Sequence, residues 1–321
     1  MPSNKTVVSA GFGFNPKGRC KLARDVDLYA AGWRLRTNLP LPAALAWPGD
    51  QMRAPDLIFV SGNVPTELPD PILDLEALQI TADGTALVRL GGIGYFLLKG
   101  AEVTYALQTE PEAPEITAAV YGNVLACIAW RRRQLALHGS AVAIDARAVL
   151  LLGPRDLGKS LLATALARRG HCMLSDEVAA VAGTRCFPAG SMLSLADDAL
   201  IAAGIAPDTL PEYTNFPRAK RLWIAGPRPE PRPYQIAAVL RLKKAEANAP
   251  IEPVRLDSDE AVETVLDQFY RRDMLKILDT GITARREAEA LIETAPVYRF
   301  PVPRTLTRVE EAADHILDLV R

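Results

Sequence analysis

The feature that most constrains this chain is an octapeptide at residues 153–160, GPRDLGKS, which fits the pattern G-x-x-x-x-G-K-[ST]. Residues 148–152 before it form a short apolar run typical of a buried strand, and residues 160–169 after it are strongly helix-forming. The pattern therefore lies between a predicted strand and a predicted helix. In that context, backbone N–H groups and the helix N-terminus point toward the phosphates of a nucleotide.

The side chains of this loop predict how the nucleotide is held. Lys159 is expected to reach the β and γ phosphate oxygens, and the Ser160 hydroxyl can ligate Mg²⁺. ATP and Mg²⁺ are therefore the expected ligands. The predicted nucleotide-binding residues are Gly153, Arg155, Gly158, Lys159, Ser160 and Leu161.

Asp156 is unusual in such a loop, because it places a carboxylate near a polyanion at a position where glycine is common. Two outcomes are open. The carboxylate weakens nucleotide binding, or it turns outward while Arg155 beside it supplies a compensating cation.

Composition excludes several other classes of function. The 37 basic and 38 acidic residues leave a net charge of −1, which removes any global electrostatic case for binding nucleic acid or an anionic membrane. The four cysteines lack metal-ligand spacing and are typical of a reducing compartment. No uncharged stretch approaches the length of a membrane span, and the N-terminus does not resemble a signal peptide. We therefore expect a cytoplasmic protein, with a homo-oligomer possible.

The pattern along the chain predicts an α/β protein with two domains. Residues 1–113 form the smaller, mainly β N-terminal domain, with strands expected at 57–60, 85–90 and 94–98. Residues 114–321 form the larger domain, beginning with a linking helix at about 115–135. Its other expected elements are a hairpin at 140–144 and 147–152, strands at 172–174 and 235–242, an extended segment at 296–301, and helices at 259–277 and 308–320.

Three residues near the loop are candidates for catalysis. His138 directly precedes the hairpin that leads into the loop, although a lone histidine is more often structural. Asp176 and Glu177 follow the strand after the loop helix, where an acidic pair can bind Mg²⁺ or accept a proton from an attacking hydroxyl. The predicted metal ligands are Ser160, Asp176 and Glu177.

Two other charged pairs are given structural roles. Asp197 and Asp198 are expected to cap a short helix at 199–203. Lys220 and Arg221 are expected on a solvated face.

Four short motifs follow one another along the chain: LHG at 137–139, the 153–160 loop, RGH at 169–171 and SDE at 175–177. In their order and spacing, residues 135–181 resemble the catalytic domain of HPr kinase/phosphorylase. The resemblance implies a P-loop, HPr-kinase-like fold and a serine kinase in which Asp176 is the general base, assisted by His138 and Glu177. A Glu-Ile-Arg-Gly-like stretch is absent, so the resemblance does not extend to phosphorolysis or to HPr as substrate.

Three further motifs are PAG at 188–190, LSL at 193–195 and PVYR at 296–299. With the mainly β N-terminal domain, they resemble a divergent branch of that family associated with ribosomally made peptides, including lasso peptide kinases. This branch implies a precursor peptide or small protein as the substrate. Two alternatives stay open: a nucleotide-binding regulator or inactive kinase, and a kinase of a small hydroxyl compound.

Overall fold

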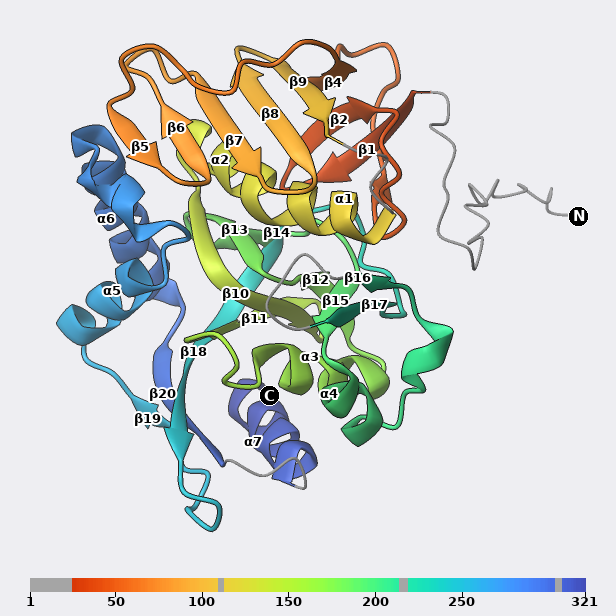
Figure 1. Ribbon diagram of the computed structural model, residues 1–321. Helices are drawn as coiled ribbons and strands as arrows, with labels where there is room; N and C mark the ends of the chain where they lie inside the picture. The colour runs from red at the N-terminus through yellow and green to blue at the C-terminus, as the bar shows by residue number, and fades with distance from the viewer. Residues whose placement is uncertain (1–24, 109–112, 214–218, 304–307) are drawn as a thin grey trace, which may run out of the picture.

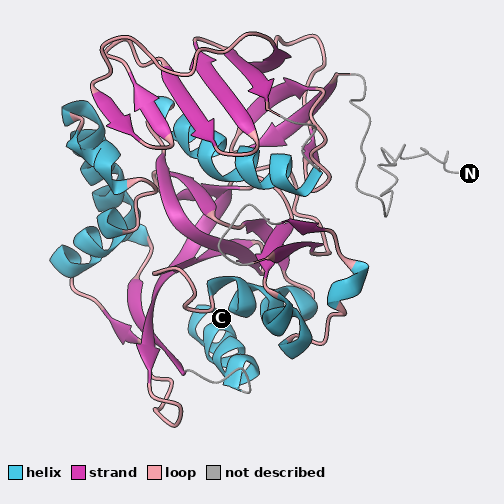
Figure 2. Cartoon of the chain, viewed as in Figure 1, coloured by secondary structure: helices cyan, strands magenta, loops and turns pink. Residues whose placement is uncertain are grey.

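The computed structural model describes residues 25–108, 113–213, 219–303 and 308–321. The chain forms a mixed α/β structure in which one large sheet lies above a linking helical segment and a second sheet lies below it (Figures 1 and 2). None of the described helices is long and apolar enough to cross a bilayer.

The first sheet has nine strands in the order β3-β1-β2-β4-β9-β8-β7-β6-β5. Only the β2–β4 and β4–β9 pairs within it are parallel. Apolar side chains alternate along these strands and bury one face of the sheet against the helices, as in β8. The strands are β1 (Val26–Ala30), β2 (Trp33–Thr37), β3 (Leu45–Ala46), β4 (Leu57–Ser61), β5 (Leu73–Leu75), β6 (Leu78–Ile80), β7 (Ala86–Leu90), β8 (Gly94–Lys99) and β9 (Glu102–Leu107).

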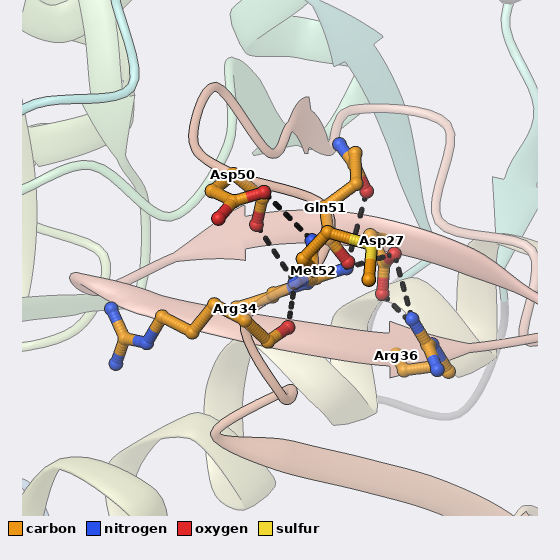
Figure 3. A network of polar contacts seen from close by, with 7 residues as sticks. Asp27, Arg34, Arg36, Asp50, Gln51 and Met52 are labelled. Carbon is orange, nitrogen blue, oxygen red and sulfur yellow. Dashed lines mark hydrogen bonds and ion pairs between the residues drawn. The ribbon is translucent and has the colours of Figure 1, made fainter.

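A buried arginine ties the loop after β3 to the start of this sheet (Figure 3). Arg34 is fully buried, its Nη2 lies 2.7 Å from Asp27 Oδ2, and its guanidinium also donates to the backbone carbonyls of Asp50 and Gln51. The Arg36 guanidinium donates to the same carboxylate, and together these contacts lower the pKa of Asp27. The ion pair with Asp27 compensates the buried charge of Arg34, so the network has a structural role.

The linking segment consists of α1 (Ala113–Ala119), the π-helix η1 (Val120–Val124) and α2 (Leu125–Arg131). The predicted helix at 115–135 is therefore confirmed in outline, but it ends at Arg131. The chain enters β10 at Leu135 because residues 135–144 are almost entirely buried in the second sheet.

The second sheet has eight strands and carries the 153–160 loop. Its path runs β11-β10-β13-β14-β18-β20-β19; β12 pairs with β10, and β11 also pairs with β18 in parallel. The strands are β10 (Leu135–Ile144), β11 (Arg147–Leu152), β12 (Cys172–Ser175), β13 (Val178–Ala182), β14 (Arg185–Phe187), β18 (Tyr234–Ala245), β19 (Val254–Arg255) and β20 (Val297–Pro303). The predicted hairpin is confirmed as β10 and β11.

Helices cover the second sheet. α3 (Lys159–Arg168) and α7 (Val309–Val320) pack on one face, where their apolar residues join those of β11, β18 and β20 in a second core. The remaining helices are α4 (Asp197–Ala202), η2 (Pro207–Thr209), α5 (Ser258–Asp267), η3 (Arg272–Lys276) and α6 (Leu278–Thr294). A small third sheet has the order β15-β17-β16, from Met192–Leu195, Lys220–Ile224 and Glu212–Tyr213.

One helix prediction is wrong in its extent, and one helix was not predicted. The helix expected over 259–277 ends at Asp267, because residues 268–270 bond to β10 instead: His138 N–H donates to Gln268 O and Tyr270 N–H donates to Ala136 O, both at 2.7 Å. The sequence pattern also missed α6. The division of the chain into two domains at residue 113 stays a prediction, because the linking segment after this residue contacts both large sheets.

Candidate functional site

The 153–160 loop connects the end of β11 to the start of α3, as the sequence predicted. Gly158 is the residue before α3 and has φ +88°, a left-handed conformation that favours glycine. The N–H groups of the first helical turn have no intrahelical partner and are suited to an anion. Leu161 is buried in that turn, so its contribution to a nucleotide site would come from its backbone N–H.

Lys159 lies inside the loop and is only 8% exposed. Its Nζ donates to the backbone carbonyls of Gly153 and Pro154, at 2.9 and 2.8 Å. Burial lowers the pKa of Lys159, and the charges of Asp176 and Glu177 act in the opposite direction. The ammonium group is thus held within the loop and close to the acid pair.

Strand β10 brings the acid pair to the loop. β12 and β13 both pair with β10 on the side away from β11. The two residues between these strands, Asp176 and Glu177, lie opposite residues 139 and 140 of β10. The Gly139 N–H donates to Glu177 O at 3.2 Å. A Cβ at Gly139 would meet Leu151 O at 2.5 Å, so only glycine allows β10 and β11 to approach this closely here.

Asp176 is buried and accepts hydrogen bonds from three directions. The Ser140 hydroxyl donates to Oδ1 at 2.6 Å, and the Ser194 N–H donates to Oδ2 at 3.1 Å. The Ser160 hydroxyl lies 3.2 and 3.3 Å from the two carboxylate oxygens. Burial and the charge of Glu177 raise the pKa of Asp176, although the Ser140 and Ser194 hydrogen bonds oppose this.

Glu177 has the opposite electrostatic environment. Burial disfavours its charge, but the His138 side chain and the charges of Lys220 and Arg155 outweigh burial and lower its pKa to about 2. His138 Nε2 lies 3.7 Å from Glu177 Oε2, and Lys220 Nζ lies 3.6 Å from Oε1. Glu177 also has φ +68°, a strained conformation of the kind found at functional sites. Two adjacent carboxylates with opposite shifts can divide the roles of proton acceptor and permanent anion.

Several site residues were not predicted. The Tyr270 ring makes an edge contact with the His138 ring at a centroid distance of 6.2 Å. Tyr270 OH and Arg271 Nη2 both donate to Asn123 Oδ1, at 3.2 and 2.5 Å, and burial raises the pKa of Tyr270 to about 12. These residues come from η1 and from the segment expected to be helical, so no periodicity in the sequence marks them.

A pocket of about 210 Å³ opens beside the acid pair. It lies between the two large sheets, because its walls include the β7–β8 turn (residues 90, 91 and 93), residues of α1 and η1, and the site itself. The charged and polar side chains that line it are Arg155, Asp176, Glu177, Glu115, Asn123, Ser194, Tyr270 and Arg271. A second pocket, about 450 Å³, lies between the turn at 81–84, α2 and α6 and contains none of the predicted site residues.

The donor set suits Mg²⁺ better than a transition metal. Within the described part of the chain, no group of three or more His, Cys, Asp or Glu side chains is arranged to hold a metal ion. Mg²⁺ is commonly held by one or two carboxylates together with substrate phosphates. The Ser160 hydroxyl beside the Asp176 carboxylate, with Glu177 next in the chain, fits that pattern.

The other charged pairs differ from their predicted roles. Asp197 and Asp198 lie in the first turn of α4, whose N-cap is Ala196, so neither residue is the N-cap as predicted. Asp198 Oδ1 does accept a hydrogen bond from the Ala199 N–H in that turn, at 2.8 Å. Asp197 instead pairs with Arg221 at 2.8 Å. Lys220 faces Glu177, so the pair at 220–221 is not simply a solvated face.

Comparison with known proteins identifies no family. No protein-family model matches the chain, and no curated protein matches it. Among solved structures, the HPr(Ser) kinase/phosphatase from Coxiella burnetii matches over 57% of this chain and 97% of its own, with 15% sequence identity and a TM-score of 0.27. A TM-score this low does not establish a shared fold, so the resemblance inferred from the motifs stays a prediction.

Asp156 lies exposed in the loop with φ +59°. We expect Asp156→Asn to strengthen MgATP binding about fivefold, because it removes a like charge worth ~1 kcal/mol near a polyanion in water and asparagine tolerates the same backbone conformation. Calorimetric titration of the wild type and the variant with MgATP measures the difference. Equal affinities would show that the carboxylate points away from the nucleotide.

Proposed function

We propose that this protein is an ATP-dependent kinase that transfers a phosphoryl group to a hydroxyl, with a serine of a precursor peptide or small protein as the acceptor. The observation that supports this most directly is the convergence of three groups. Lys159, the Ser160 hydroxyl and the buried Asp176 carboxylate meet at the start of α3, with Ser160 Oγ 3.2 Å from Asp176 Oδ1.

Each group has a role in the proposed transfer. Lys159 and the N–H groups of the loop neutralise the β and γ phosphates of ATP. Ser160, Asp176 and Glu177 are suited to hold Mg²⁺, which supplies further neutralisation of phosphate charge. Asp176, whose pKa is raised, orients the acceptor hydroxyl and takes its proton. His138 contacts Glu177 and positions that carboxylate.

The pocket beside the acid pair provides a path for the acceptor. It reaches Asp176 and Glu177 from the side of the nine-stranded sheet, so the first sheet would form one wall of the acceptor site.

The size of this pocket also supports a second candidate function, phosphorylation of a small hydroxyl compound. At about 210 Å³ it is smaller than the pockets that enclose drug-sized ligands, and it suits one side chain or one small molecule.

The test is to titrate the purified protein with MgATP and MgGTP by calorimetry and to follow ADP or GDP formation without and with acceptor. The acceptors are serine-containing peptides encoded beside this protein's gene and a panel of small hydroxyl compounds. Binding followed by peptide phosphorylation supports the first proposal, and phosphorylation of small compounds alone supports the second. Binding without transfer to any acceptor, water included, would identify an inactive regulator, and the absence of binding would refute both kinase proposals.

A further inference from the structure

Lys220 is a cation at the site whose position depends on the small third sheet. It is the first residue of β17, it is partly buried, and its Nζ lies 3.6 Å from Glu177 Oε1. The neighbouring strand β15 pairs with β17 and supplies the Ser194 N–H that donates to Asp176 Oδ2. The third sheet therefore contacts both members of the acid pair, one through each strand, and this holds Lys220 in a defined position.

Lys220 and Lys159 face the same acid pair from different elements. Lys159 belongs to α3, and Lys220 belongs to β17. The charge of Lys220 lowers the pKa values of Asp176, Glu177 and Lys159, which places all four groups within one electrostatic cluster. Together with Arg155, the cluster holds three cations and two acids, an excess of positive charge that suits the phosphates of a nucleotide.

The next residue in the chain has a different environment. Arg221 points to the other side of β17, where its Nε lies 2.8 Å from Asp197 Oδ1 and its Nη2 lies 2.8 Å from Glu212 Oε2. Because side chains alternate along a strand, Lys220 and Arg221 share their backbone setting but not their surroundings. Arg221 is therefore a matched control for Lys220.

We propose that Lys220 is a further catalytic residue, whose ammonium group contacts the γ-phosphoryl oxygens of ATP during transfer and stabilises their charge. This inference rests on the proposed kinase function. In the transfer, the bond from the γ phosphorus to the β,γ-bridging oxygen breaks, and its electron pair leaves with ADP. A new bond forms from phosphorus to the acceptor oxygen, whose proton passes to Asp176. Lys220 supplies charge and exchanges no proton.

The first experiment compares Lys220→Gln with Arg221→Gln. Calorimetry measures MgATP affinity, and the rate of ADP formation is measured with water as the acceptor. We expect Lys220→Gln to lower kcat about 100-fold, the typical effect of removing one transition-state contact, while the affinity for MgATP changes only a few-fold. Arg221→Gln should leave both quantities unchanged. A kcat for Lys220→Gln within threefold of the wild type would overturn the proposal.

A second comparison separates contact with the phosphate from positioning of Glu177. Lys220→Gln is repeated in a Glu177→Gln background, where there is no carboxylate for Lys220 to position. A further large fall in kcat is expected if Lys220 contacts the phosphoryl group, whereas no further fall would show that it acts only through Glu177 and would overturn the proposal. Wild-type protein that neither binds MgATP nor forms ADP would refute the kinase function and this role together. Normal wild-type turnover with an unaffected Lys220→Gln variant refutes the role alone.

Discussion

Lys159→Ala is expected to weaken MgATP binding about a hundredfold or more and to abolish phosphoryl transfer. The Lys159 ammonium is buried, is held by the carbonyls of Gly153 and Pro154, and faces the acid pair. Truncating one partner of a buried, hydrogen-bonded charge pair typically costs about 2–5 kcal/mol of binding free energy. In Lys159→Ala, a bound polyphosphate would lose its contact with the ammonium group, and the carboxylates of Asp176 and Glu177 would repel it.

Calorimetric titration with MgATP measures this effect. Lys159→Met is a useful second variant, because it keeps most of the side-chain volume and removes only the charge. Lys243→Ala is the control, because Lys243 is exposed on β18 and does not line the pocket beside the acid pair. Circular dichroism melting establishes that each variant is folded. MgATP affinity in Lys159→Met equal to that of the wild type would contradict the proposed role of the loop.

Asp176→Asn is expected to lower kcat by roughly 10²–10⁴-fold while MgATP affinity stays within about tenfold of the wild type. Asparagine is nearly the same size and can still accept a hydrogen bond, but it cannot accept a proton from the acceptor hydroxyl. The measurement is steady-state transfer to an identified acceptor, or to water, beside calorimetry. A kcat reduced by less than tenfold would show that Asp176 is not the general base.

The raised pKa of Asp176 predicts a second effect of Asp176→Asn, an effect on stability. The variant loses activity but is not expected to lose stability. In the folded protein the carboxyl binds its proton more tightly than in the unfolded chain, so its contribution to stability falls as pH rises from its ordinary pKa to the raised one. At neutral pH the wild type therefore carries a buried charge that Asp176→Asn lacks. We expect the variant to melt at the same temperature as the wild type or higher.

The elements around the loop were predictable because their signals are local. The apolar run at 148–152, the 153–160 loop and the helix after it occupy consecutive residues, and the structure contains them as β11, the loop and α3. The hairpin before them follows from two apolar runs separated by a two-residue turn, Asp145 and Ala146, both with positive φ. The tail was less predictable, since α6 was missed and the segment at 268–270 pairs with β10.

The sequence alone determined where the loop, the histidine and the acid pair lie along the chain, because residue types and their spacing are local properties. Only the tertiary structure decided which groups surround them. Tyr270, Lys220 and Asn123 come from three separate parts of the chain. They reach the site through pairing with β10, through the third sheet and through η1. The opposite pKa shifts of Asp176 and Glu177 have the same origin, because burial and neighbouring charges are set by residues distant in sequence.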